Sequence, residues 1–304
     1  MENITPANQN KLNASTYSEA LTAFTVGWQD SGAAKILDFV APAIPVGRRF
    51  EFKRADNAEA FYSESDDLRA IGSEFKRVRY SGESVNEKTL NKGLTMRVDH
   101  DEVADDGWQE RYTQILLQRL LRNELRRAVL ALETVAKANG SPSVWDSSAN
   151  PDSDIRAMLS ACADESGVRP NKILFGEDAW AMRLDSLESQ STAVALRASS
   201  LTPAELAAKF LLEGCEVMSA RYQQTPAQKA KIASNKIFAF SAFGGVSKDE
   251  PSNLKRFYTP SSEGTAFKVY LEEHAKYTDI TVEHYSTIVA ASTLGVRALE
   301  VSNS

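Results

Sequence analysis

The segment from Trp108 to Ala138 contains neither proline nor glycine, and it constrains the fold more than any other part of the sequence. Asp105-Asp106 before it favours a helix start, and Asn139-Gly140 after it is a standard helix stop. Apolar side chains recur along it at helical spacing: Trp108, Tyr112, Leu116, Leu117, Leu120, Leu121, Leu125, Ala128, Val129 and Leu132. We predict one helix of about 31 residues, roughly 46 Å long. A helix well over twice the usual length serves as a structural spine.

Alternating strand patterns precede this helix, between Arg48 and Val98. Phe50 and Phe52 alternate with charged residues, and the same period of two recurs at Val78 and Tyr80 and at Leu94, Met96 and Val98. About 20 of the 50 residues from Arg48 to Arg97 are charged, nearly balanced in sign. Long strands with one weakly apolar face are marginal in isolation. The pattern predicts a projecting β-hairpin that is buried against something outside its own domain; the alternative is a solvated sheet on an ordinary domain.

The first 46 residues carry weaker signals. Residues 1 to about 30 are rich in Asn, Thr, Ser and Ala, and their large apolar side chains (Leu21, Phe24, Val26, Trp28) come late. Such a segment cannot bury enough surface to fold alone, so we expect either disorder or an arm that rests on a partner. The stretch from Ile36 to Val46 is interrupted by two prolines and predicts a strand or an extended connector.

The remainder of the chain predicts an α+β fold. Between about Ser141 and Gly264, helices are expected at 152–164 and 178–187 and from Thr202-Pro203 onward, and strands at 171–176, 216–222 and 236–243. The tail from Phe267 to Val301 again alternates with a period of two, which indicates sheet strands.

Composition excludes several classes of protein. The chain has 304 residues, 42% hydrophobic and 25% charged, with a net charge of -6, which argues against a dedicated nucleic-acid reader. No window approaches the roughly 18 apolar residues of a membrane span, and the start lacks the features of a secretory signal. We therefore expect a soluble chain made inside the cell.

Catalytic and metal-binding patterns are scarce. Cys162 and Cys215 fall on apolar elements and are expected to be buried small hydrophobes. The cluster Asp99-His100-Asp101-Glu102 could hold a metal only with distant ligands that the sequence does not supply, so a solvated turn is the better interpretation. The pairs Glu272-Glu273-His274 and Glu283-His284 are interpreted in the same way. With no nucleophile or nucleotide motif either, we expect no catalytic, cofactor or metal site.

A cluster of arginines on the long helix leaves two interpretations open. Arg119, Arg122, Arg126 and Arg127 could face the phosphates of a nucleic acid, although no pattern of stacking aromatics accompanies them. Alternatively, they pair with carboxylates on a neighbouring element or chain.

The order of these elements resembles the major capsid proteins of tailed phages, whose coat fold is also used by encapsulin shells. The most similar local sequences are Arg169–Gly176 followed by Asp178-Ala179-Trp180, and Ile280–Tyr285. The resemblance implies an N-terminal arm (1–30), a connector (31–46), an extended β-hairpin loop (47–98), a peripheral domain with the spine helix (99–140), an axial domain (141–270) and further peripheral strands (271–304).

The resemblance also implies a non-enzymatic function without cofactors. The chain would assemble into pentamers and hexamers of an icosahedral shell enclosing double-stranded DNA, as part of a virion capsid made in the host bacterial cytoplasm. Its partners would be copies of itself, scaffolding and portal proteins, and a decoration protein in some shells, with no membrane. The alternatives are an encapsulin-like nanocompartment and, less favoured, a metal-dependent hydrolytic enzyme.

Contacts between subunits are expected on the charged hairpin. Some family members join a hairpin lysine to a neighbour's asparagine; Lys53, Lys76, Lys88 and Lys92 are available here, but the sequence supplies no partner geometry and we do not expect this crosslink. The expected contact residues are Arg48, Arg49, Phe50, Phe52, Arg54, Arg77, Arg79, Tyr80, Lys88 and Lys92.

Overall fold

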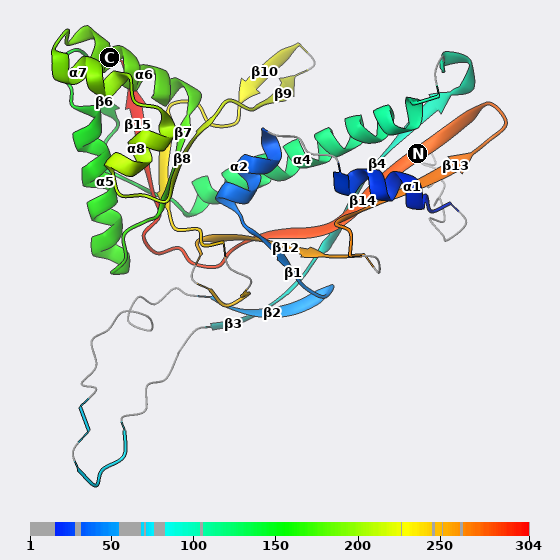
Figure 1. Cartoon of the computed structure of the whole chain (residues 1–304), viewed down its shortest axis with the longest axis horizontal. Coiled ribbons are helices and arrows are strands. Elements are labelled where there is room, and N and C mark those ends of the chain that lie inside the picture. The colour runs from blue at the N-terminus through cyan, green and yellow to red at the C-terminus, as the bar shows by residue number, and fades with distance from the viewer. Residues whose placement is uncertain are drawn as a thin grey trace, which may run out of the picture.

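The computed structural model describes residues 16–27, 32–54, 68–69, 71–75, 83–103, 106–225, 227–244, 247–250, 252–261 and 264–303. In this part of the chain, an elongated sheet backed by a long helix adjoins a compact domain of helices around a second sheet (Figure 1). Two small two-stranded sheets accompany these bodies. The mixed helix-and-sheet architecture confirms the predicted α+β class.

The predicted spine is helix α4, Trp108–Val135, with 28 residues and a length of about 42 Å. Its leucine-rich face is buried, and Leu117, Leu125 and Leu132 have no exposed surface. The predicted end at Ala138 was wrong, because Lys137–Ala138 form strand β5 and the Lys137 amide donates to the Val296 carbonyl at 3.0 Å. The predicted start signal was wrong too: Gly107 precedes the helix and provides no side-chain cap.

Strand β14, Tyr277–Ala290, is the central strand of the elongated sheet. It pairs antiparallel with β4 (Leu90–Asp99) along one side and with β12 (Leu254–Thr259) and β13 (Phe267–Glu273) along the other. Strand β1 (Ala43–Pro45) extends the sheet parallel to β12. Helix α4 packs on this sheet through a cluster of buried residues that includes Val98, Leu116, Leu117, Leu120, Val269, Ile280 and Val282.

The compact domain is built on a sheet with the strand order β5-β15-β11-β7-β8, in which β6 also pairs with β15. Apart from β5, its strands are β6 (Ser143–Val144), β7 (Lys172–Gly176), β8 (Gly214–Met218), β11 (Lys236–Phe240) and β15 (Arg297–Ser302). Its helices are α5 (Pro151–Ser166), α6 (Glu177–Ser189), α7 (Ala193–Ser199) and α8 (Pro203–Lys209). As predicted, α8 begins at Thr202-Pro203, where Thr202 and Glu205 form a capping box.

A small hairpin follows β8 and consists of β9 (Arg221–Thr225) and β10 (Gln228–Lys231). The single strand predicted at 216–222 is therefore two strands, and the strand predicted at 236–243 ends at Phe240.

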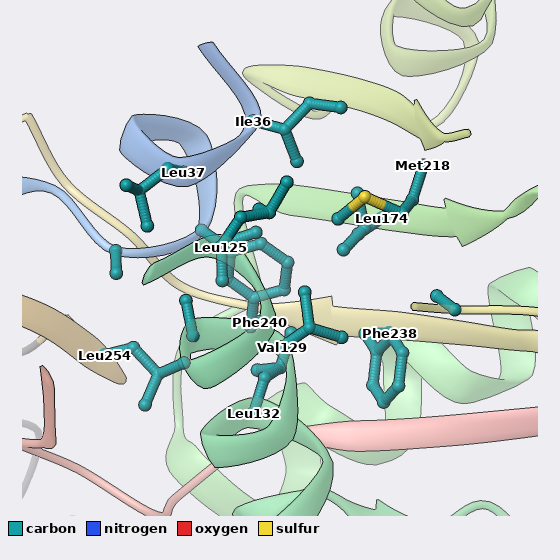
Figure 2. Close-up of a cluster of buried hydrophobic side chains, with 14 of the residues drawn as sticks. Ile36, Leu37, Leu125, Val129, Leu132, Leu174, Met218, Phe238, Phe240 and Leu254 are labelled. Carbon is teal, nitrogen blue, oxygen red and sulfur yellow. The ribbon is translucent and has the colours of Figure 1, made fainter. Parts of the chain in front are cut away.

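One hydrophobic core joins the two bodies. The second half of α4 contributes Leu125, Val129 and Leu132, which face Leu174, Phe238 and Phe240 of the compact sheet (Figure 2). Helix α2, Ala33–Val40, covers the same core with Ile36, Leu37 and Val40. The strand or extended connector predicted for Ile36–Val46, within the expected connector 31–46, was therefore wrong where this helix extends, up to Val40. The two prolines that suggested an extended chain, Pro42 and Pro45, both lie after it.

The N-terminal segment is ordered within its own chain from Thr16 onward. The Leu271 amide donates to the Thr16 carbonyl at 2.7 Å, and the Ser18 amide donates to the Val269 carbonyl at 2.9 Å. Helix α1, Glu19–Gly27, follows and buries Leu21 at 3% exposure. The expectation of an arm without a fold of its own therefore fails for 16–27, and residues 1–15 and 28–30 of the expected arm lie outside the described part.

Strand membership also departs from the expected domain boundaries. Strands β12 and most of β13 fall within the expected axial range 141–270, yet they belong to the elongated sheet. Strand β15 falls within the expected peripheral range 271–304, yet it pairs with β11 inside the compact domain. Strand β4 falls within the expected loop 47–98, yet all ten of its residues pair with β14. Alternation predicts a strand but not its partner.

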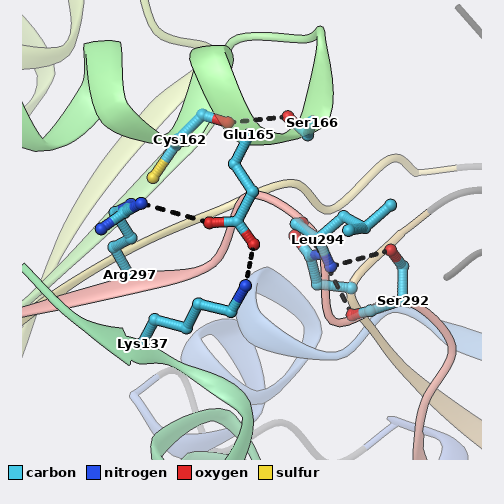
Figure 3. A network of polar contacts seen from close by, with 8 residues as sticks. Lys137, Cys162, Glu165, Ser166, Ser292, Leu294 and Arg297 are labelled. Atoms are coloured by element: carbon cyan, nitrogen blue, oxygen red, sulfur yellow. Dashed lines mark hydrogen bonds and ion pairs between the residues drawn. The ribbon is translucent and has the colours of Figure 1, made fainter. Parts of the chain in front are cut away.

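A polar junction holds β5, α5 and β15 together. The Glu165 carboxylate accepts from Arg297 at 3.3 Å and also pairs with Lys137 (Figure 3). Beside it, the Ser166 hydroxyl donates to the Cys162 carbonyl. Gly295 has φ +65°, and a Cβ on it would lie 2.6 Å from Ser166 Oγ, so this turn requires glycine both for its backbone and for its space.

We expect Gly295→Ala to lower the free energy of unfolding by about 2–4 kcal/mol, from left-handed strain together with overpacking. Gly140 is the matched control, because it has φ +78° but no atom within 4 Å of an added Cβ. Gly140→Ala should cost about 1 kcal/mol from strain alone. Urea unfolding of both variants tests this, and equal losses would show that Ser166 does not restrict the turn.

Candidate inter-subunit surface

The charged hairpin predicted before the spine begins as a two-stranded ribbon. Strand β2 (Arg49–Arg54) pairs antiparallel with β3 (Glu83–Lys88), and Arg54 lies opposite Glu83 where the ribbon opens into the loop. Of the expected contact residues in this loop, Arg77, Arg79 and Tyr80 lie outside the described residues, as does the strand pattern around Val78.

One face of the ribbon packs on its own chain. The ring centroids of Phe50 and Phe257 are 4.5 Å apart, and those of Phe52 and Phe257 are 5.5 Å apart. Phe52 has no exposed surface, so its expected role in a contact between subunits was wrong. The alternation of Phe50 and Phe52 with charged residues correctly predicted that one face of this strand is buried. It could not show that the elongated sheet of the same chain buries that face.

The other expected ribbon residues are accessible. Arg49 and Lys88 lie opposite each other in the ribbon, both exposed, and line an open hollow of about 670 Å³ with Phe50, Glu51, Asn86 and Glu87. Arg54 lies 3.8 Å from Glu83. The exposed Arg48 places its guanidinium 4.0 Å from the Tyr285 ring centroid. The accessible ribbon thus presents both signs of charge around a partly apolar floor.

Three exposed apolar residues in the loop were missed by the sequence patterns. The stretch 71–75 lies away from both bodies (Figure 1). Leu68, Ile71 and Phe75 are 85%, 104% and 69% exposed, respectively. Exposed apolar side chains on a projecting segment are of the kind that a contact with another molecule would bury. The sequence feature that could have identified them is the presence of three large apolar residues in a charged stretch, without the alternation that would place them in a sheet.

Lys92, another expected contact residue, is held inside the chain. Its ammonium donates to Glu124 of the spine helix at 2.8 Å and to Ser286 of β14 at 3.1 Å. Glu124 has no exposed surface and also accepts from Arg127 at 2.6 Å and from the Ser286 hydroxyl at 2.9 Å. Burial raises the pKa of this carboxyl, but the ammonium of Lys92 and the hydrogen bonds that the carboxylate accepts together outweigh it, so its pKa lies below the ordinary value. Lys92 therefore fastens β4 to the spine.

His284 lies in the same environment. It is 5% exposed, stacks on Phe267 at 5.0 Å between ring centroids, and its Nε2 makes no hydrogen bond. Burial lowers the pKa of His284 to about 4 despite the nearby Glu124. The imidazole is therefore neutral at pH 7 and acts as a packing group.

The other titratable candidates occupy structural positions. His100–Glu102 form a short turn in which the Asp101 amide donates to Asp99, and His100 contacts Thr278. Across the described residues, no group of three or more His, Cys, Asp or Glu side chains could hold a metal. Burial raises the pKa of both Cys162 and Cys215 to about 12, in agreement with their predicted role as small hydrophobes.

Comparisons with known proteins identify the fold. No family model matches the sequence, and a search of curated proteins gives no significant match. The structure is similar to a phage-related protein from Bordetella bronchiseptica RB50, with a TM-score of 0.70 and 19% identity over 94% of this chain and 97% of that chain. It is also similar to a chain of Microbacterium phage Oxtober96 (TM-score 0.53, 13% identity, 90% and 93% covered) and to the SrpI encapsulin of Synechococcus elongatus PCC 7942 (0.51, 10%, 90% and 89%).

The protein therefore has the coat fold of tailed phages, which encapsulins share, as the order of its elements predicted. The match extends over both bodies, since it covers 94% of the chain. No helix in the described ranges is long and apolar enough to cross a membrane.

The buried imidazole predicts a loss of stability in mild acid. Between pH 6.5 and 4, the unfolded chain binds a proton at His284 that the folded chain excludes, so the free energy of unfolding falls as the pH falls. From pH 7 to pH 5 this contributes a loss of about 2 kcal/mol. Urea unfolding of the unassembled subunit measures it.

The His284→Gln variant should lack this dependence, whereas His100→Gln, at an exposed position, should retain it. A wild-type stability that stays flat from pH 7 to pH 5 would contradict the assignment.

Proposed function

We propose that this protein is the structural subunit of a phage capsid, which assembles with copies of itself into pentamers and hexamers of an icosahedral shell around double-stranded DNA. The observation that carries the proposal is the coat fold, matched over 94% of the chain. Closed shells of this kind arise when each subunit offers two different surfaces that meet head to tail.

The projecting loop supplies one such surface. Leu68, Ile71 and Phe75 are more than two-thirds exposed in a single chain, and a neighbouring subunit would remove them from water. The base of the loop carries Arg49 and Lys88 beside Glu51 and Glu87. A surface with both signs of charge suits another copy of the same chain better than a partner of one sign.

The proposal also names the contact residues, the partner proteins and the location. Arg48, Arg49, Phe50, Arg54 and Lys88 are proposed to contact a neighbouring subunit, together with Arg77, Arg79 and Tyr80. Scaffolding and portal proteins, and in some shells a decoration protein, would direct assembly. The location would be the virion capsid, after synthesis in the host bacterial cytoplasm. The role is structural, in keeping with the inert burial of both cysteines.

Replacing residues 55–82 by Asn-Gly tests the loop. Arg54 and Glu83 are paired in register, so a two-residue turn can close the ribbon without disturbing β2 and β3. We expect the free energy of unfolding of the unassembled subunit to change by less than about 1 kcal/mol, because the apolar residues removed from the described part are exposed. Electron microscopy should show shells for the wild type and none for this variant.

A milder variant, Leu68→Ser/Ile71→Ser/Phe75→Ser, retains the chain length and should assemble more slowly or less completely than the wild type. Shell formation by the loop replacement at the wild-type level would contradict the proposed contact. The absorbance ratio and nuclease resistance of purified particles then separate a DNA-filled capsid from a compartment that holds protein.

A further inference from the structure

The solvent-facing side of the spine helix carries a straight row of arginines. Arg119, Arg122 and Arg126 follow the spacing i, i+3 and i+7, which places them on one stripe opposite the buried leucines. All three are exposed, whereas Leu117, Leu121 and Leu125 on the other side are buried. The stripe is thus presented to solvent by the longest helix of the described residues.

The positive charges on this stripe have no carboxylate partner in the part of the chain that the structure describes. Arg119 and Arg122 have no ion pair among the residues that the structure describes. Arg126 stacks on Tyr222 of the β9–β10 hairpin, with its guanidinium 3.8 Å from the ring centroid. Arg127, the next residue, differs from the stripe because it forms an ion pair with Glu124.

The acidic residues of helix α4 itself lie off the stripe. Between Arg111 and Ala131, helix α4 has a single carboxylate, Glu124, which is fully buried. Glu133, about two turns beyond Arg126, pairs with Lys236. All five basic residues of α4 are arginines: Arg111, Arg119, Arg122, Arg126 and Arg127. Arginine binds phosphate oxygens in a bidentate fashion, which a lysine ammonium does not.

We propose that the Arg119–Arg122–Arg126 stripe is the surface that contacts the phosphate backbone of double-stranded DNA, so that the spine side of the subunit faces the interior of the shell. This inference rests on the proposed capsid function. The three residues span about 10.5 Å of helix, which is about three base-pair steps along the axis of a DNA duplex. A straight row of like charges matches a linear polyanion and carries no base-reading groups.

The charge of the whole chain supports a local rather than a general attraction. The net charge of -6 repels DNA from most of the surface. A row of arginines would therefore both bind the DNA and determine which side of the subunit faces it. The other possible occupant is a set of carboxylates on a second copy. The two-signed ribbon already offers pairing for a second copy, whereas the stripe is of one sign, which favours DNA.

The test compares two charge-matched double variants of the full chain. Arg119→Gln/Arg122→Gln removes two charges from the stripe; Arg156→Gln/Arg197→Gln removes two from exposed positions on α5 and α7. Fluorescence anisotropy measures the binding of unassembled subunits to a 25-base-pair duplex of random sequence between 25 and 200 mM KCl.

We expect the stripe variant to bind about tenfold more weakly at low salt, and its plot of log K against log salt to be shallower by about 2. The control variant should match the wild type. Equal affinity and slope for the two double variants would overturn the inference, as would a wild type that does not bind the duplex at 25 mM KCl.

Shell assembly separates this inference from the proposed function. A stripe variant that still forms shells but encloses less DNA supports the stripe. A stripe variant that remains folded by urea unfolding but forms no shells identifies the stripe as a contact between subunits and overturns the inference. Failure of the wild type itself to form shells contradicts the capsid role. In that case the binding of free subunits to the duplex alone decides whether the stripe contacts DNA.

Discussion

The fold depends on burying one face of a single long helix with two different sheets. The first half of α4 packs on the elongated sheet through Leu116 and Leu120, and the second half packs on the compact sheet through Val129 and Leu132. Neither sheet covers the helix alone. The two bodies are therefore held at a fixed relative position by a helix that contributes to the core of both.

A buried carboxylate fixes how the helix lies on the elongated sheet. Glu124 lies near the point where the contacts of α4 pass from one sheet to the other, and it receives hydrogen bonds from Lys92, Arg127 and Ser286. A shift of the helix by one turn would leave that carboxylate and the Lys92 ammonium buried without partners, which is a heavy penalty. Leucine packing alone is tolerant of such a shift. The polar cluster thus supplies the alignment that the apolar contacts leave open.

The sequence predicted elements better than their partners. The spine, the capped start of α8, the buried strand β7 and the alternating tail were all evident from local spacing. Helix α2 was not predicted because the prolines that follow it suggested an extended chain. Helix α1 was not predicted because its segment is polar in composition, and its few apolar residues are buried only by packing on the elongated sheet. At the candidate surface, the ribbon was predicted. Phe52 and Lys92, however, were predicted to contact a neighbouring subunit, because a period of two does not show which part of the same chain covers each face of a strand. Pairing between residues some 190 positions apart, such as Lys92 and His284 in adjacent strands, leaves no local trace.

The position of β15 has a consequence for the order of folding. This strand lies between β5 and β11, so one edge of β11 stays open until Arg297–Ser302 pair with it. A nascent chain that has emerged only as far as β11 exposes an open strand edge, and contacts of such long sequence separation form slowly. Strand β15 therefore completes the compact sheet, because β5 and β6 pair with it alone and cannot join the sheet before it does.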